Sequence, residues 1–221
     1  MEYNKEKIGI LVGMLLGDAY IEKDGQFSIG HSIKQKDYLL YKQERLKDFF
    51  KTSYTERNCG PNNKYLECFI RSRTSKYFKL MRRLWYKPQK RLLKKMIYKI
   101  SPEGLAYWYL DDGSLVFQKD KNGNVISRKG YLNTQGFTYD ENLLLSEMLK
   151  EKFGIETKIH RDKKYFRLYL NSSELKKLFS IISGYIPPST YYKLCFRYGK
   201  KYQNYNLCKK ECSNNCPYHI L

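Results

Sequence analysis

Apolar residues recur at helical spacing near the start of the chain. They are Ile8, Leu11, Val12, Leu15 and Leu16. This spacing predicts a helix over residues 4–17, with Asn4 as its N-cap. The helix is expected to end at Gly17-Asp18, because the apolar period stops there.

Alternating apolar and polar residues follow in two short segments, 19–23 and 26–33, on either side of Asp24-Gly25. Because Asp-Gly is among the strongest hairpin-turn dipeptides, we expect two antiparallel strands here. The remaining elements of this half are predicted as a helix at 35–50, a hairpin of 53–58 with 64–71, and a helix at 75–85.

The same order of elements returns after a basic connector. The second set is a helix at 102–111, strands at 114–118 and 130–135, a helix at 139–153, strands at 156–161 and 164–170, and a helix at 173–182. The pattern predicts an α+β fold of two tandem αββαββα units related by a pseudo-twofold axis. The expected boundaries are 1–86 for the first half, 87–101 for the connector, 102–195 for the second half and 196–221 for the tail.

The charge of the chain indicates a polyanionic partner. Its 42 Lys and Arg residues against 22 Asp and Glu give a formal net charge of +20. The 22 tyrosines, whose rings stack and whose hydroxyls reach phosphates, favour nucleic acid over a lipid surface. No apolar run approaches the roughly 20 residues that span a bilayer.

The cysteines and the first residues bear on where the protein works. The six cysteines are not spaced like a disulfide framework, which favours a reducing compartment. The start of the chain has mixed charge and no small-residue cleavage pattern. We therefore expect a cytoplasmic or organellar protein that is not secreted.

The first helix carries Gly9, Gly13 and Gly17 on one face, which lets another backbone approach closely. We expect its partner to be the helix at 104–111, packed across the pseudo-twofold axis. That packing would bring Asp18 and Asp112 together at two helix ends. A divalent cation would relieve their repulsion and the unfavourable helix dipoles.

Residues 11–19 (LVGMLLGDA) and 105–113 (LAYWYLDDG) resemble the motif of the LAGLIDADG homing endonucleases. The resemblance covers residues 4 to about 195, and it is to the single-chain, two-motif kind. It implies two halves, each with a four-stranded antiparallel DNA-binding sheet. It also implies a monomer that cuts both strands of a long, asymmetric DNA site and leaves short 3′ overhangs.

The resemblance assigns metal ligands as well. The motif aspartates fall on Asp18 and Asp112, and the carbonyls of Gly17 and Asp111 would be auxiliary ligands. The second copy departs from the first, because Tyr107 replaces Gly13 and Asp111 replaces Gly17. The Asp111 carboxylate is therefore a rival ligand. Two or three Mg²⁺ ions shared between the halves are expected, since the donors are all oxygen.

Members of this family also place a lysine from each half near the attacking water or the scissile phosphate. By position these are Lys90 and Lys193, although Lys87 or Arg91 could take the role of Lys90. Gln35 matches a position that orients water near the metal. The alternative for the lysine is a simple phosphate contact or a solvated side chain. The alternative for Gln35 is an exposed residue in the first turn of a helix.

Strand alternation selects the side chains expected to face the major groove, which admits β-ribbons. In the first half they are Tyr20, Glu22, Gln26, Ser28 and Ser32; in the second half they are Ser114, Gln118, Asn133, Gln135, Lys158, His160, Tyr165, Arg167 and Tyr169. The alternative is a solvated sheet face. The absence of acids from residue 68 to 102 and from 175 to 210 argues against it.

The tail holds four potential zinc ligands in twelve residues: Cys208, Cys212, Cys216 and His219. Their spacing is shorter than that of common zinc fingers, so reduced thiols are the alternative to a structural Zn²⁺ site.

The sequence therefore favours a metal-dependent double-strand DNA endonuclease. The main alternative is a maturase that uses the same fold to bind intron RNA without cutting DNA. The presence of both aspartates favours the nuclease, because a pure binding protein does not need two carboxylates brought together at two helix ends. A transcription factor built from the same halves would bind DNA without metal. A protein of anionic membranes is disfavoured, because the sequence contains no basic amphipathic helix with a lipid-facing stripe.

Overall fold

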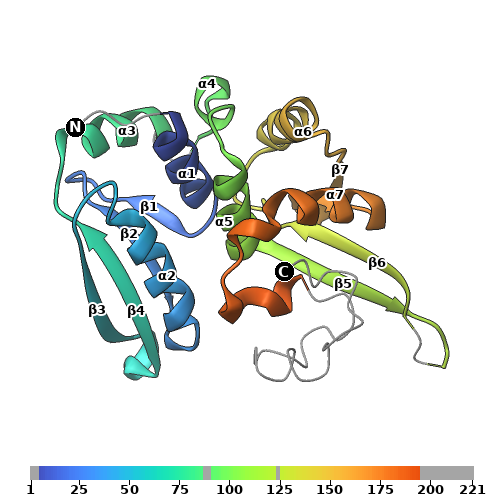
Figure 1. Cartoon of the computed structure of the whole chain (residues 1–221), viewed down its shortest axis with the longest axis horizontal. Coiled ribbons are helices and arrows are strands. Elements are labelled where there is room, and N and C mark those ends of the chain that lie inside the picture. The colour runs from blue at the N-terminus through green and yellow to red at the C-terminus, as the bar shows by residue number, and fades with distance from the viewer. Residues whose placement is uncertain (1–4, 87–90, 123–124, 195–221) are drawn as a thin grey trace. The chain divides into compact units, whose positions relative to one another are not determined.

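The computed structural model describes residues 5–86, 91–122 and 125–194 (Figure 1). The chain divides into two compact units, 1–101 and 102–221. Residues 87–90 and 195–221 lie outside the described residues, and with them Lys90 and the four predicted zinc ligands of the tail.

The first unit is built from three longer helices, one short helix and four strands. In chain order they are α1 (Lys5–Leu16), β1 (Ala19–Ile21), β2 (Phe27–Ser32), α2 (Lys36–Leu46), β3 (Thr52–Cys59), β4 (Tyr65–Ser72), α3 (Lys76–Trp85) and α4 (Lys94–Ile97). The strands form an antiparallel sheet in the order β1-β2-β4-β3. Helix α2 lies along one face of this sheet (Figure 1).

Local chemistry explains the first hairpin and the third helix. Gly25 has a φ of 86°, and the Asp24 carboxylate accepts from the Gln26 amide at 3.1 Å, which closes the predicted turn. Ser75 caps α3 by accepting from the Phe78 amide at 3.1 Å. Phe78 then packs on Phe27, with 5.4 Å between the ring centroids, so the helix is fixed to the sheet.

The second unit repeats this topology. Its elements are α5 (Pro102–Asp112), β5 (Gly113–Lys119), β6 (Val125–Leu132), α6 (Tyr139–Phe153), β7 (Lys158–Asp162), β8 (Tyr165–Leu170) and α7 (Ser172–Ile182), followed by the 3₁₀ helices η3 (Ser183–Tyr185) and η4 (Pro188–Lys193). The sheet order is β5-β6-β8-β7, with all pairs antiparallel. A Thr138–Glu141 capping box begins α6, and Gly154 in the left-handed region ends it.

In both sheets, buried apolar residues pair with each other across neighbouring inner strands. In the first, Ile29 pairs with Ile70, both fully buried; in the second, Leu132 pairs with Leu168, also buried. Successive side chains point to opposite faces, so each sheet has an apolar face toward its helices and a second face. We call the second one the polar face.

The structure departs from the sequence prediction in several places. Strand β6 spans Val125–Leu132 rather than residues 130–135, so Asn133 and Gln135 lie after the strand. Helix α2 ends at Leu46 rather than at residue 50. A one-turn helix, α4, lies in the connector, and η4 follows the Pro187-Pro188 step. At Gly9, the space of the missing side chain is filled by backbone from the same unit, since an added Cβ would lie 2.6 Å from the Lys99 carbonyl oxygen.

In the described part of the chain, no helix is both long enough and apolar enough for a membrane span.

Asn142 on α6 is expected to be important for the stability of the second unit. It is completely buried, donates to the Thr138 carbonyl at 2.9 Å and accepts from the Thr134 hydroxyl at 2.5 Å. Asn142→Leu should lower the free energy of unfolding by about 2–3 kcal/mol, because the buried partners lose their hydrogen bonds. Urea unfolding measures this. Glu147→Leu, at an exposed position of the same helix, is the control, and an equal loss in both variants would contradict the assignment.

Candidate functional site

Asp18 lies between the end of α1 and the start of β1, at the position that the sequence motif predicts. The Gly17 amide still donates to the Gly13 carbonyl at 3.2 Å, so the helical turn extends to the residue before Asp18. The Asp18 side chain is 42% exposed, and its Oδ2 lies 3.4 Å from Nδ1 of His31 on β2. The carboxylate therefore contacts His31 and is partly exposed.

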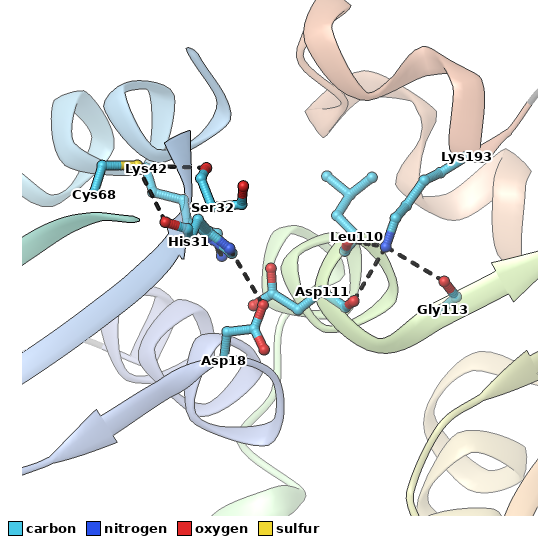
Figure 2. A network of polar contacts seen from close by, with 9 residues as sticks. All are labelled: Asp18, His31, Ser32, Lys42, Cys68, Leu110, Asp111, Gly113 and Lys193. Atoms are coloured by element: carbon cyan, nitrogen blue, oxygen red, sulfur yellow. Dashed lines mark hydrogen bonds and ion pairs between the residues drawn. The ribbon is translucent and has the colours of Figure 1, made fainter. Parts of the chain in front are cut away.

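A buried polar chain runs inward from Asp18. Nε2 of His31 lies 3.1 Å from Nζ of Lys42 on α2 (Figure 2). The His31 side chain is 2% exposed, and Lys42 is completely buried with its ammonium 4.3 Å from the centroid of the Tyr38 ring. The sequence analysis assigned His31 no role. The available signal was Lys42, a cation on the same helical stripe as the buried Tyr38, Leu39 and Leu46.

In the second unit, the end of α5 is held by main-chain contacts. The Asn133 amide and side chain both donate to the Asp112 carbonyl, at 3.0 and 2.8 Å. Asn133 was predicted to face DNA, and the structure places its side-chain NH₂ on this carbonyl. Asp111 and Asp112 are both half-buried.

Lys193, the predicted catalytic lysine of the second unit, lies at the same helix end. Its ammonium donates to the carbonyls of Leu110, Asp111 and Gly113, the last two at 3.1 and 3.4 Å (Figure 2). A cation among the last carbonyls of a helix is electrostatically favourable. The backbone of Lys193 is held as well, because the Tyr109 hydroxyl donates to the Lys193 carbonyl at 3.0 Å.

The Tyr109 hydroxyl stays protonated and can therefore donate this hydrogen bond. Complete burial raises its pKa far above the ordinary value, so the hydroxyl keeps its proton. Its ring also packs edge-on against Phe179 of α7, with 5.3 Å between the centroids. Helix α7, η4 and the end of α5 are thus tied into one local arrangement.

Oxygen donors predominate among the candidate metal ligands of each unit. The first offers the Asp18 carboxylate and the Gly17 carbonyl, and the second offers the carboxylates of Asp111 and Asp112. This donor chemistry fits Mg²⁺. The Asp111 carbonyl, a predicted auxiliary ligand, already accepts from Lys193, although its second lone pair is not used by that contact. Gln35 is half-buried at the end of a 3₁₀ turn, directly before α2.

The polar face of the second sheet carries a cluster of rings and one cation. His160 and Tyr169 stack with centroids 4.3 Å apart and planes 3° apart, and Tyr131 packs edge-on against Tyr169 at 5.6 Å. The Arg167 guanidinium lies 3.9 Å from the centroid of the Tyr131 ring. Sequence reasoning selected His160, Arg167 and Tyr169 but missed Tyr131, whose alternation on β6 could have identified it.

Electrostatics keep His160 neutral within this cluster. Burial, and then the charges of Arg167 and nearby lysines, lower its pKa below the ordinary value, so the ring is uncharged at pH 7. The cluster therefore offers an uncharged stacked pair beside a permanent cation.

The other residues predicted on this face are spread around the cluster. Ser114 pairs with Tyr131, Lys158 pairs with Tyr169, and Tyr165 lies exposed at the hairpin end. Gln118 is exposed near the end of β5. Gln135 donates to the Asp162 carboxylate at 3.1 Å, and this carboxylate also lies 3.9 Å from Arg167.

The polar face of the first sheet carries a different cluster. Arg57 and Arg71 lie 4.1 and 5.2 Å from the centroid of the Phe69 ring. The sequence analysis selected none of these three residues. Their positions on β3 and β4 became clear only from the strand register.

The predicted residues of this face differ in exposure. Ser28 pairs with Tyr20 on one side and Arg71 on the other. It is completely buried between these strands, so its selection as a DNA-facing residue is wrong, whereas Ser32 is exposed. Glu22 and Gln26 line a shared pocket with Arg71 and Arg82. Ser28 Oγ and the Nε atoms of Arg71 and Arg167 are buried without a hydrogen-bond partner in the described part of the protein, so both polar faces hold unused hydrogen-bonding capacity.

Comparison with known proteins gives a family match over most of the chain. The profile of the LAGLIDADG DNA endonuclease family matches residues 8–178. An uncharacterized protein of Methanocaldococcus jannaschii is 35% identical over 184 residues, which span 80% of this chain and 68% of that protein. A probable intron-encoded DNA endonuclease of Mycosarcoma maydis is 41% identical over 91 residues, 41% of this chain and 61% of the relative.

A solved structure matches both units. The homing endonuclease I-WcaI bound to its DNA recognition sequence superposes with a TM-score of 0.73 and 25% sequence identity. The match covers 90% of this chain and 89% of that one.

Proposed function

The chain belongs to the LAGLIDADG DNA endonuclease family, and on that basis we propose that it cuts both strands of a long, asymmetric DNA site in a metal-dependent reaction. The expected products have short 3′ overhangs, and the expected active species is the monomer, since one chain contains two units of the same topology.

The observation that carries the proposal is the repetition of one arrangement in both units. In each, an apolar helix ends beside an aspartate and leads directly into the first strand of a four-stranded sheet. We propose that Asp18 and Asp112 act together in holding two or three Mg²⁺ ions. When bound, such ions neutralise the scissile phosphate and favour an attacking hydroxide.

The side chains of this chain would orient the reacting groups. Gln35 and Lys90 are proposed to act near Asp18, with Lys90 on the scissile phosphate or the attacking water. Lys193 is proposed to act beside Asp112. Its contacts with the end of α5 support a location at the site, because that helix end leads into Asp112.

The polar faces of the two sheets are proposed to lie along the major groove. The ring and arginine clusters support this role, since arginine reads base edges and rings contact bases and sugars. The I-WcaI structure contains that protein's recognition DNA, which agrees with double-stranded DNA as the partner here.

Arg167 provides a specific test of the DNA-binding role. Arg167→Gln should weaken binding to the cognate site by about 1–3 kcal/mol, because it removes a cation that lies against the Tyr131 ring on the polar face. Filter binding over a salt series measures the affinity and the salt slope. Arg161→Gln, on the opposite face of the same hairpin, is the matched control. Equal affinity loss in both variants would show that charge alone matters.

The proposed reaction is tested by selecting cleaved molecules from a randomised DNA library with the full chain. A single long recovered site, cut in Mg²⁺ and intact in Ca²⁺, is expected. Random cutting, or a cut that is independent of the divalent ion, would contradict a specific metal-dependent endonuclease.

A further inference from the structure

Lys42 is the most deeply buried cation of the first unit's described residues. Its relative exposure is 0%, and its ammonium lies 3.1 Å from His31 Nε2 and 4.3 Å from the Tyr38 ring. Burying a lysine is costly unless a partner compensates for lost hydration. A methionine would fill the same space without that cost, so the ammonium calls for a reason beyond packing.

The chemistry of the ammonium group determines the hydrogen positions on the histidine ring. A lysine ammonium has three donors and no acceptor, so Nε2 of His31 must be the acceptor in their contact. A neutral imidazole that accepts at Nε2 carries its hydrogen at Nδ1. Nδ1 is the atom that lies 3.4 Å from Oδ2 of Asp18 (Figure 2).

We propose that Lys42 and His31 are positioning residues that orient the Asp18 carboxylate for metal binding. Lys42 holds His31 in the Nδ1–H form, and the ring directs that hydrogen at one carboxylate oxygen. The second oxygen is then presented in a fixed direction. This inference rests on the proposed function, because it assumes that Asp18 is a metal ligand.

The gradient of burial supports this role. The ammonium is completely buried, the His31 side chain is 2% exposed, and the Asp18 side chain is 42% exposed. The series of contacts from Lys42 through His31 to Asp18 therefore begins in the core and ends at a partly exposed carboxylate. The backbone of His31 is fixed as well, because its carbonyl accepts from the Cys68 thiol at 3.4 Å.

The second unit lacks this arrangement at the matching position. Ala19 pairs with Ile29 and Gly113 pairs with Leu132, so His31 on β2 corresponds to Thr134 after β6. The Thr134 hydroxyl donates to Asn142. The two aspartates are thus supported differently, since the contact with His31 and Lys42 is made by Asp18.

The first readout is the hydrogen position, measured by long-range ¹H–¹⁵N spectra of the full chain without metal. The chain has three histidines, so the ring signals can be assigned by substitution. We expect the Nδ1–H form for His31 in the wild type and a mixture of forms in Lys42→Met. Lys36→Met, at an exposed position of the same helix, should leave the spectrum of His31 unchanged. A wild-type ring with its hydrogen on Nε2 would overturn the inference.

The second readout is Mn²⁺ affinity, measured by electron paramagnetic resonance of the free ion. We expect about tenfold weaker binding in Lys42→Met and His31→Phe, because removal of a ligand's hydrogen-bonding partner typically costs about 10–100-fold. His31→Asn, whose amide can take the place of Nδ1–H, should restore part of the affinity.

The outcomes separate this inference from the proposed function. If the wild type and Lys42→Met bind Mn²⁺ equally well, the positioning role is wrong and the metal site stands. If the wild type binds no Mn²⁺, with or without DNA, the metal site of the proposed function fails and the positioning role fails with it.

Discussion

Asp18→Asn should reduce the rate of DNA cleavage by at least about 10³-fold while leaving DNA affinity nearly unchanged. A bound metal ion supplies several kcal/mol of transition-state stabilisation, and each loss of about 1.4 kcal/mol slows a reaction tenfold. The amide retains the shape of the carboxylate and an oxygen that can accept from His31 Nδ1, so the surrounding contacts should persist. Single-turnover cleavage and binding in Ca²⁺ separate the two effects.

Asp37→Asn is the matched control for that prediction. Asp37 is an exposed carboxylate in the first turn of α2, in the same unit. The Asp37→Asn variant should cut DNA at close to the wild-type rate. Cleavage by Asp18→Asn at the rate of the control would show that the metal is held elsewhere.

Lys193→Met should slow cleavage by about 10²-fold and also lower the stability of the second unit. The catalytic part of the effect follows from the typical contribution of a group that assists proton transfer, about 10²–10⁴-fold. The structural part follows from the contacts of the ammonium with three carbonyls at the end of α5, and a cation there stabilises a helix by about 0.3–2 kcal/mol. Single-turnover rates and thermal unfolding of the same protein measure both parts.

Two further variants separate the roles of Lys193. Lys176→Met removes an exposed charge from α7 and should change neither quantity. Lys193→Arg keeps the charge at the helix end and should recover stability more completely than cleavage, because its planar fork cannot repeat the ammonium geometry. Loss of stability with an unchanged cleavage rate would show that Lys193 only caps the helix.

The order of helices and strands followed from periodicity and turn residues. In the described residues, both four-stranded sheets and their flanking helices were predicted in the correct order, with most boundaries within a few residues. Strong turn signals such as Asp24-Gly25, and apolar stripes of ten or more residues, explain this success.

The errors in the fold have local causes. Phe49 and Phe50 continue the apolar pattern of α2, so the pattern predicts four more helical residues. In the structure the chain turns after Leu46, and Phe50 packs edge-on against Phe78 with 5.0 Å between the centroids. The single turn of α4 is too short to show a period, and it lies in a run of basic residues that suggested only a connector.

The candidate site was predicted in part. The motif placed Asp18 and Asp112 beside the ends of two helices, as the structure has them. The partners of Asp18 could not be found in the same way. His31 and Lys42 come from a strand and a helix whose mutual register is set by packing, and neither carries a motif.

The measurement that tests the central claim most directly is cleavage of the selected DNA site by the wild type and by Asp112→Asn in Mg²⁺, with sequencing of both product ends. We expect the wild type to produce short 3′ overhangs and Asp112→Asn to bind the site without producing them. Equal cleavage by the two proteins would contradict the assignment of the site. Tight, metal-independent binding to structured intron RNA with no DNA cleavage by the wild type would replace the endonuclease with a maturase.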